Sequence, residues 1–287
     1  MIRATIIGFL VIITPICLLA FSEETITYYS DSTISLKATI YTPEKDTLKP
    51  ALVLIHEGGF TSGSRFCFNQ YGAYFTGRGY VVMSIDYRLV QQGGAYPVAL
   101  KDCIEAVKWL KANHRIYQVD KERIALIGSS AGAYLATMIG LAKGLPADIR
   151  QGHGKNKGED TSVRVVVSSF GVYDWEKTEW KGDGFINPDQ EKEASPIQYA
   201  EHAGAAFLLL AGGRDRLFNK EQAEEFKNRI KAKDKTVELY VKSRQGHAGL
   251  CDINSPLVTW ALPIINSFLL DKLERCIPCE RNYRKPE

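Results

Sequence analysis

The sequence lacks any long block of like charge. Its 36 basic and 33 acidic residues nearly balance, which gives a formal net charge of +3 over 287 residues. A chain that binds nucleic acid normally concentrates Lys and Arg in one run or on one face. We therefore expect no nucleic-acid partner. The chain also lacks internal repeats and an interdomain linker, and its hydrophobic fraction of 45% is typical of a globular protein with a substantial core.

Cysteine is scarce, with six residues in the whole chain. Cys276 and Cys279 form a Cys-x-x-Cys pair, which can be half of a metal site or a redox pair. No second Cys-x-x-Cys or His-x-x-His accompanies it in the sequence, so a zinc site is not completed. We interpret the pair as a C-terminal staple or as two ordinary cysteines, and expect neither a metal nor an organic cofactor. The sequence leaves open how Cys67, Cys103, Cys251, Cys276 and Cys279 pair.

Only one long apolar run is present, and it lies at residues 4–21, just after Arg3. Ala20 and Ser22 stand in the small-residue pattern of a signal-peptidase site, and two glutamates follow. We predict that residues 1–22 are a cleaved signal peptide, so that the protein is secreted or periplasmic and has no stable membrane partner. The alternative is an uncleaved membrane anchor over residues 4–21.

The remaining residues, 23–287, are expected to form one domain in which short apolar runs alternate with helical periodicity. This alternation predicts an α/β fold, with a mostly parallel sheet covered by helices on both faces. The expected strands are 33–41, 51–56, 80–86, 123–128, 163–170, 206–212 and 236–242, and the expected helices are 96–113, 133–142, 219–233 and 255–273.

Two polar stretches interrupt this rhythm, at residues 144–162 and 176–196. Both are rich in glycine and charged residues and show no clear periodicity, so they are too polar to be core. We expect them to form loops or a small lid over the carboxyl edge of the sheet, where α/β proteins keep their sites.

Residues 128–132 read Gly-Ser-Ser-Ala-Gly, a Gly-x-Ser-x-Gly pattern between a predicted buried strand and a predicted helix. A sharp strand-to-helix turn forces close contacts that glycine tolerates on either side of the serine. The turn lifts Ser130 to the edge of the sheet, where the helix N-terminus offers N–H groups to a developing oxyanion. We predict that Ser130 is a nucleophile.

A serine hydroxyl needs a base, and the base needs an orienting acid. His247 lies in the loop after the predicted strand 236–242, and Asp215 lies in the loop after the strand 206–212. The chain order Ser, Asp, His is the order of the α/β-hydrolase triad. Because the carboxyl ends of parallel strands meet at one edge, we expect the three side chains to converge, with His247 as the base and Asp215 as its orienter.

The run His-Glu-Gly-Gly-Phe at 56–60 ends a predicted strand, and its glycines can turn backbone N–H groups toward a substrate oxygen. With this run the chain resembles the α/β-hydrolase superfamily, in the esterase/lipase group with a His-Gly-Gly-Gly-type oxyanion motif. That group includes hormone-sensitive-lipase-like carboxylesterases and secreted acetyl and feruloyl esterases.

The resemblance runs from about Tyr28 to Leu270 and implies the α/β-hydrolase fold. It also implies an oxyanion hole made by the N–H groups of Gly58, Gly59 and Ala131. Further matching runs are DYRL at 86–89, YPVALKD at 96–102, GVYDW at 171–175, ASPIQYA at 194–200, GGRDRL at 212–217 and GHAG at 246–249.

Glu57 departs from this motif, because it stands where the first glycine is usual. A carboxylate that pointed at a developing oxyanion would repel it. We expect Glu57 to point away from the oxyanion, toward Arg65 or another basic group.

The predicted function is that of a secreted serine esterase for short-acyl carboxylic esters. Trp175 and Trp180 lie at polar insertions that lack the apolar walls a long acyl chain needs, which favours an acetylated or feruloylated carbohydrate ester as substrate. The alternatives are an amide-cleaving hydrolase such as a formamidase or peptidase, and a lipase. A non-catalytic binding protein of the same fold is disfavoured, because such proteins usually lack a member of the triad.

Overall fold

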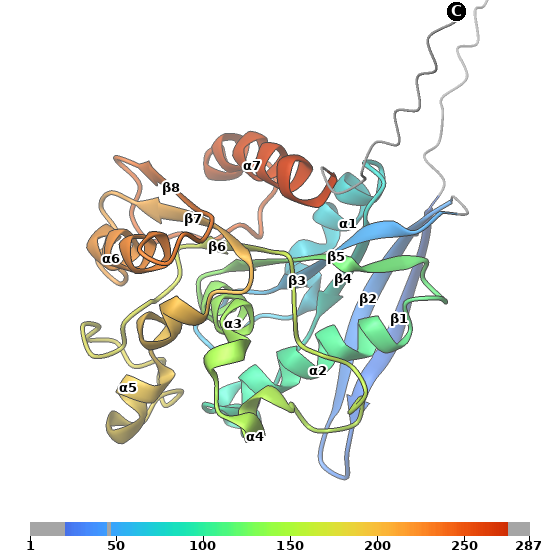
Figure 1. Ribbon diagram of the computed structural model, residues 1–287, viewed down its shortest axis with the longest axis horizontal. Helices are drawn as coiled ribbons and strands as arrows, with labels where there is room; N and C mark the ends of the chain where they lie inside the picture. The colour runs from blue at the N-terminus through green and yellow to red at the C-terminus, as the bar shows by residue number, and fades with distance from the viewer. Residues whose placement is uncertain (1–20, 45–46, 275–287) are drawn as a thin grey trace, which may run out of the picture.

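The computed structural model describes residues 21–44 and 47–274. They form an eight-stranded sheet in the order β1-β2-β4-β3-β5-β6-β7-β8, with helices on both faces (Figure 1). β1 and β2 are antiparallel to each other, β2 is antiparallel to β4, and every other neighbouring pair is parallel. The predicted α/β fold is therefore confirmed. The strands are β1 (Phe21–Ser30), β2 (Ser35–Pro43), β3 (Lys49–Ile55), β4 (Val81–Ile85), β5 (Val119–Ser129), β6 (Val165–Ser169), β7 (Ala206–Gly212) and β8 (Val237–Lys242).

The two faces of the sheet carry different helices. α1 (Asn69–Thr76) and α7 (Pro256–Leu269) pack on one face, and α2 (Val98–Ala112), α3 (Ala131–Gly140) and α6 (Lys220–Lys231) pack on the other. Two short helices, α4 (Ala147–Arg150) and α5 (Glu191–Ala194), lie in the connections. The 3-10 turns are η1 (Arg65–Phe68), η2 (Val90–Gln92), η3 (Ala142–Gly144), η4 (Pro188–Gln190) and η5 (Pro196–His202), and the π-helical turn η6 (Leu270–Glu274) follows α7.

The central strands are apolar along their whole length because both faces of the sheet are covered. In β3, Val53 and Ile55 belong to the core under α2 and α3, whereas Leu52 and Leu54 belong to the core under α1 and α7. All four side chains are fully buried. This packing holds the strands in place. The loops that follow the parallel strands therefore all begin at the carboxyl edge of the sheet.

Each strand and helix expected from the sequence has a counterpart, with boundaries that differ by a few residues. Four strands or helices were not predicted: β1, α1 and the short helices α4 and α5. β1 begins at Phe21, so cleavage after Ser22 would remove the first two residues of this strand. The rest of the predicted signal peptide, residues 1–20, lies outside the described residues, as does the Cys276–Cys279 pair. Within the described part of the chain, no helix has both the length and the hydropathy needed to cross a membrane.

The two polar insertions have different surroundings. Residues 144–162 pack along α2, where the buried Glu105 carboxylate accepts hydrogen bonds from the backbone of His153 and Asn156. His153 also lies 2.6 Å from the buried Asp102 carboxylate. The expectation that this insertion covers the carboxyl edge as a lid is wrong, because buried acids on α2 hold it against the helix. Residues 176–196, in contrast, do reach the carboxyl edge of the sheet, where Trp180 lines the same cavity as Ser130.

Candidate active site

The nucleophile turn joins β5 to α3 at Ser130, whose backbone has φ 51° and ψ −116°. A non-glycine residue in this region of φ is strained and is held there by its surroundings. The Ser130 N–H donates to the Ser169 carbonyl of β6 at 2.8 Å. A Cβ on Gly128 would overlap the Gly132 carbonyl, and a Cβ on Gly132 would overlap the Ile55 carbonyl. Both glycines of the Gly-x-Ser-x-Gly pattern are therefore required by close backbone approach.

The three residues predicted as a triad lie in one hydrogen-bonded chain. The Ser130 Oγ is 2.9 Å from the His247 Nε2, and the His247 Nδ1 is 2.9 Å from the Asp215 Oδ2. A carboxylate can only accept, so the Nδ1 carries the proton and donates to Asp215, which leaves Nε2 to accept from the Ser130 hydroxyl. This is the tautomer that a base for Ser130 requires.

Asp215 is fixed by its own turn. Its side chain is fully buried, and its other oxygen, Oδ1, accepts the N–H groups of Leu217 and Phe218 at 2.9 and 3.0 Å. The rings of Phe170 and Phe218 meet the His247 imidazole edge to face, with centroids 6.1 and 5.1 Å away. No sequence pattern pointed to these two rings, because they follow different strands and meet only in the fold.

Of the three predicted oxyanion donors, Gly58 and Gly59 line the same cavity as Ser130, and Ala131 directly follows Ser130 in the chain. Ala131 is the first residue of α3, where N–H groups have no partner within the helix. Gly58 and Gly59 have φ of 118° and 62°, a backbone conformation that favours glycine. Within residues 21–44 and 47–274, no acceptor is recorded for the N–H groups of Gly58, Gly59 or Ala131. Their N–H groups are therefore available to a substrate oxygen.

The Glu57 side chain extends toward the segment of Cys251, and its partner is not the predicted one. Its carboxylate accepts the Leu250 N–H at 2.8 Å, in the loop that carries His247. Arg65 instead forms an ion pair with Asp86 at 2.6 Å. The expectation of a basic partner is wrong because Asp86, at the end of the neighbouring strand β4, already holds the guanidinium.

A cavity of about 310 Å³ opens over Ser130 and His247. Its other walls come from the oxyanion loop, the second polar insertion and the two loops that carry Asp215 and His247. The lining residues are Glu57, Gly58, Gly59, Ser130, Trp180, Leu217, His247, Ala248 and Gly249.

Trp180 and Trp175 have different places in the structure. Trp180 lines the cavity, where its indole N–H donates to Asp183 and its ring stacks on Phe60. Trp175 is completely buried against Phe60 and Phe185, so the expectation that it forms part of a sugar-binding rim is wrong. The insertion folds around this aromatic cluster, which a count of polar residues does not show.

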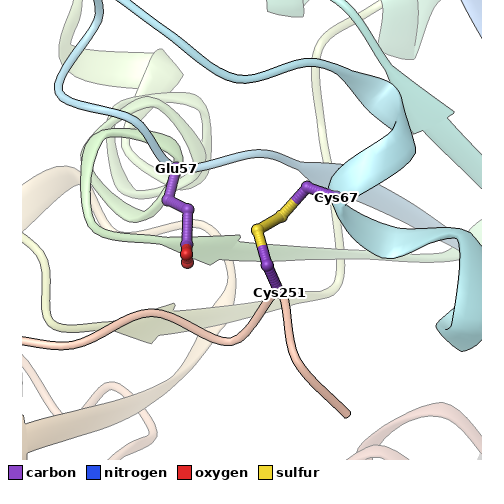
Figure 2. A group of neighbouring side chains, drawn as sticks. All are labelled: Glu57, Cys67 and Cys251. Atoms are coloured by element: carbon purple, nitrogen blue, oxygen red, sulfur yellow. A yellow bond between two sulfur atoms is a disulfide. The ribbon is translucent and has the colours of Figure 1, made fainter.

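Cys67 of η1 and Cys251 form a disulfide that spans 184 residues of sequence (Figure 2). The Glu57 carboxylate and the two sulfurs lie within 4.8 Å of one another. This group resembles a metal site by residue type, but metal-binding cysteines are thiolates and these two sulfurs are bonded to each other. Cys103 is a free thiol that is buried in the core, and burial raises its pKa.

The sheet order, the nucleophile turn after β5 and the loops after β7 and β8 together define an α/β hydrolase, in agreement with the resemblance inferred from the sequence. Within that class the chain belongs to the BD-FAE family, whose model matches residues 38–230.

Curated relatives carry esterase and lipase names. Esterase LipC of Mycobacterium tuberculosis is 30% identical over 203 residues, which are 64% of this chain and 48% of that protein. Lipase 2 of Moraxella sp. is 27% identical over 58% of this chain and 43% of its own length. The chain thus spans about half the length of these relatives. Among solved structures, propionate-bound esterase Est2 of Thermogutta terrifontis aligns with a TM-score of 0.76 at 20% identity, over 87% of this chain and 94% of that one.

Proposed function

We propose that this protein is a carboxylic ester hydrolase that works through an acyl-enzyme on Ser130. The observation that carries the proposal is the hydrogen-bonded chain from Asp215 through His247 to Ser130 at the floor of a cavity. The esterase names of the relatives support the same activity.

In the first half of the proposed reaction, the Ser130 Oγ attacks the ester carbonyl carbon while the His247 Nε2 takes the hydroxyl proton. The carbonyl oxygen becomes an oxyanion, which the N–H groups of Ala131, Gly58 and Gly59 stabilise. Asp215 stabilises the imidazolium that forms. The tetrahedral intermediate collapses when the bond to the alcohol oxygen breaks and His247 returns its proton to that oxygen. The alcohol leaves, and the acyl group stays on Ser130.

In the second half, His247 takes a proton from a water molecule, whose oxygen attacks the acyl carbon. The same N–H groups stabilise the second oxyanion. The bond to the Ser130 Oγ then breaks, the serine recovers its proton from His247, and the carboxylic acid is released. No further reagent is needed to balance either half.

The substrate we propose is a short-acyl ester, with an acetylated or feruloylated carbohydrate favoured. The cavity lies at the small end of the range for ligand pockets, about 300–1,000 Å³. Besides Glu57 and His247, its walls offer one indole, one leucine and small residues, which give little apolar area for a long acyl chain. The exposed part of Trp180 gives a flat surface on which a sugar ring can stack.

A substrate panel tests both the reaction and its range. We expect p-nitrophenyl acetate and butyrate to be hydrolysed faster than the decanoate, and an aminoacyl p-nitroanilide to be hydrolysed slowly. Acetylated and feruloylated sugars then test the preferred alcohol. A maximum at the decanoate would make the protein a lipase, and faster cleavage of the anilide would make it an amide hydrolase.

We also propose that the protein is exported, with residues 1–22 removed and 23–287 as the mature hydrolase domain. The apolar run and small residues before Glu23 support this, and a disulfide is typical of an oxidising compartment. Mass spectrometry of the protein recovered outside the cytoplasm tests it, with an N-terminus at Glu23 as the expected result. Retention in the membrane with an intact N-terminus would support the anchor alternative.

A further inference from the structure

Leu250, three residues after His247, makes hydrogen bonds through both its N–H and its carbonyl. Its N–H donates to the Glu57 Oε2 at 2.8 Å and also approaches the Ser129 Oγ at 3.2 Å. Its carbonyl accepts the Tyr71 hydroxyl at 2.6 Å. The side chain of Leu250 is fully buried. The histidine loop is thus fixed by groups that lie 121 to 193 residues earlier in the chain.

Gly249 brings the same carboxylate still closer to His247. A Cβ on Gly249 would overlap the Glu57 carboxylate, although the backbone of Gly249 is not in the left-handed region. Glycine at this position therefore leaves the space that the Glu57 carboxylate occupies. The carboxylate lies directly on the backbone two residues after the catalytic histidine.

The surroundings make the Glu57 contact strong. A hydrogen bond from an N–H to a carboxylate is charge-assisted and is stronger than one between neutral groups. Glu57 is half-buried. Burial raises the pKa of Tyr71, and the negative charges of Glu57 and Asp252 raise it further. The Tyr71 hydroxyl therefore keeps its proton and remains a donor to Leu250.

Glu57 also immediately precedes Gly58 and Gly59, two of the proposed oxyanion donors. Figure 2 shows its side chain extending from that loop toward the segment of Cys251. One residue therefore connects the loop that would hold the oxyanion with the loop that carries His247. In the resembling oxyanion motif a glycine stands at this position and can make no such contact.

We propose that Glu57 is a positioning residue, whose carboxylate holds segment 247–250 so that the His247 imidazole stays on the Ser130 hydroxyl. This inference rests on the proposed esterase function. Misplacement of a catalytic group by about 1 Å can cost on the order of 10²-fold in rate. The hydrogen bond between Leu250 and Glu57 limits displacement of the His247 imidazole, because Leu250 lies on the same short loop as His247.

The kinetic test compares Glu57→Gly, Glu57→Gln and a control, Asp252→Asn. Asp252 carries a neighbouring negative charge, and its carboxylate accepts the Asn254 N–H and not the Leu250 N–H. We expect Glu57→Gly to lower kcat about 10- to 100-fold with KM nearly unchanged. Glu57→Gln should keep most of the activity, because its amide oxygen can accept the Leu250 N–H, and Asp252→Asn should match the wild type. Wild-type kcat in Glu57→Gly would overturn the proposal.

A second variant asks whether Glu57 acts through this segment. Gly249→Ala should displace the carboxylate from Leu250 and reproduce the loss of kcat seen in Glu57→Gly. The double variant should then be no slower than either single one, because both changes remove the same contact. Additive losses would overturn the proposed route from Glu57 to His247.

Hydrogen exchange at the Leu250 amide supplies a readout that does not depend on ester hydrolysis. We expect faster exchange in Glu57→Gly at a temperature well below its unfolding transition, and near wild-type exchange in Glu57→Gln. If the wild type hydrolyses no ester, the proposed function fails, and the exchange alone decides whether Glu57 holds the loop. Unchanged exchange in Glu57→Gly would overturn the inference even in an active enzyme.

Discussion

The nucleophile turn, residues 128–132, and the histidine loop, residues 245–251, reach the same hydrogen bond by different means. In the turn, backbone packs on backbone, because Gly128 and Gly132 leave no room for a Cβ. In the loop, side chains from distant elements hold the backbone, with Glu57 at Leu250 and Cys67 at Cys251. The first region is specified by a local pattern of five residues, and the second by contacts that form only when the whole sheet is assembled.

This difference indicates where the geometry of the site can be altered. A side chain added at Gly128 or Gly132 collides with the backbone, and replacement of Ser130 removes the proposed nucleophile. The contacts that hold the histidine loop can be removed one at a time, because each is made by a separate side chain.

Removing either end of the Ser130–His247 hydrogen bond should have the largest effect. We expect Ser130→Ala and His247→Ala each to lower kcat about 10⁶-fold, since members of a triad act as a unit, and the double variant to be no worse. Unchanged circular dichroism would establish that both variants fold. Near-full activity in Ser130→Ala would reassign the nucleophile, with Ser129 as the next candidate.

Asp215→Asn tests the third member, whose carboxylate is held by its own turn at Leu217 and Phe218. The amide can donate to the imidazole and so favours the wrong tautomer, and we expect kcat to fall about 10⁴-fold with KM little changed. Steady-state kinetics on p-nitrophenyl acetate measure both constants. A large rise in KM with kcat preserved would mean that Asp215 serves binding instead.

The disulfide between Cys67 and Cys251 should contribute to the stability of the whole fold. Changing both Cys67 and Cys251 to serine frees a closure of 184 residues, and we expect it to lower the free energy of unfolding by about 2–4 kcal/mol. Urea unfolding of the oxidised wild type and of the double variant measures this difference. Treatment with a reductant should shift the wild type and leave the variant unchanged, and equal stability of all forms would contradict the expectation.

His56 provides the smallest effect and belongs to neither region. Burial lowers its pKa from 6.5 to about 4, and it stacks on Tyr87 with its Nδ1 2.7 Å from the Glu57 carbonyl. As pH falls through 6.5 the unfolded chain takes up a proton before the folded one, so stability is lost from pH 6.5 down to about pH 4. Between pH 7 and 5.5 this amounts to about 1 kcal/mol.

Urea unfolding at the two pH values measures this loss in the wild type and in His56→Asn, which has no titrating ring but keeps an N–H donor. The wild type should lose about 1 kcal/mol more than the variant. An equal loss in both proteins would show that His56 does not contribute to the acid sensitivity.

The sequence was sufficient for the features whose determinants are local. Short apolar runs predicted the buried strands. The Gly-x-Ser-x-Gly pattern predicted the turn, because its two close backbone contacts need glycine. The convergence of Ser130, Asp215 and His247 could then be predicted, because each residue comes after the carboxyl end of a strand in a parallel sheet.

The remaining features depend on long-range packing. The partner of Glu57 could not be read from the chain, because Leu250 is 193 residues away and offers a backbone N–H that every residue has. Trp175 was expected at a polar rim, but Phe60 and Phe185 enclose it. β1 was missed because its first residues were assigned to the end of the signal peptide, and its remaining residues show no strong periodicity.

The most direct test of the account is covalent labelling by a fluorophosphonate, which reacts with an activated serine and needs no knowledge of the natural substrate. Peptide mass spectrometry then locates the adduct. The account predicts one label per chain, on Ser130, and its loss in both Ser130→Ala and His247→Ala. A label on Ser129, or undiminished labelling of Ser130 in His247→Ala, would contradict it.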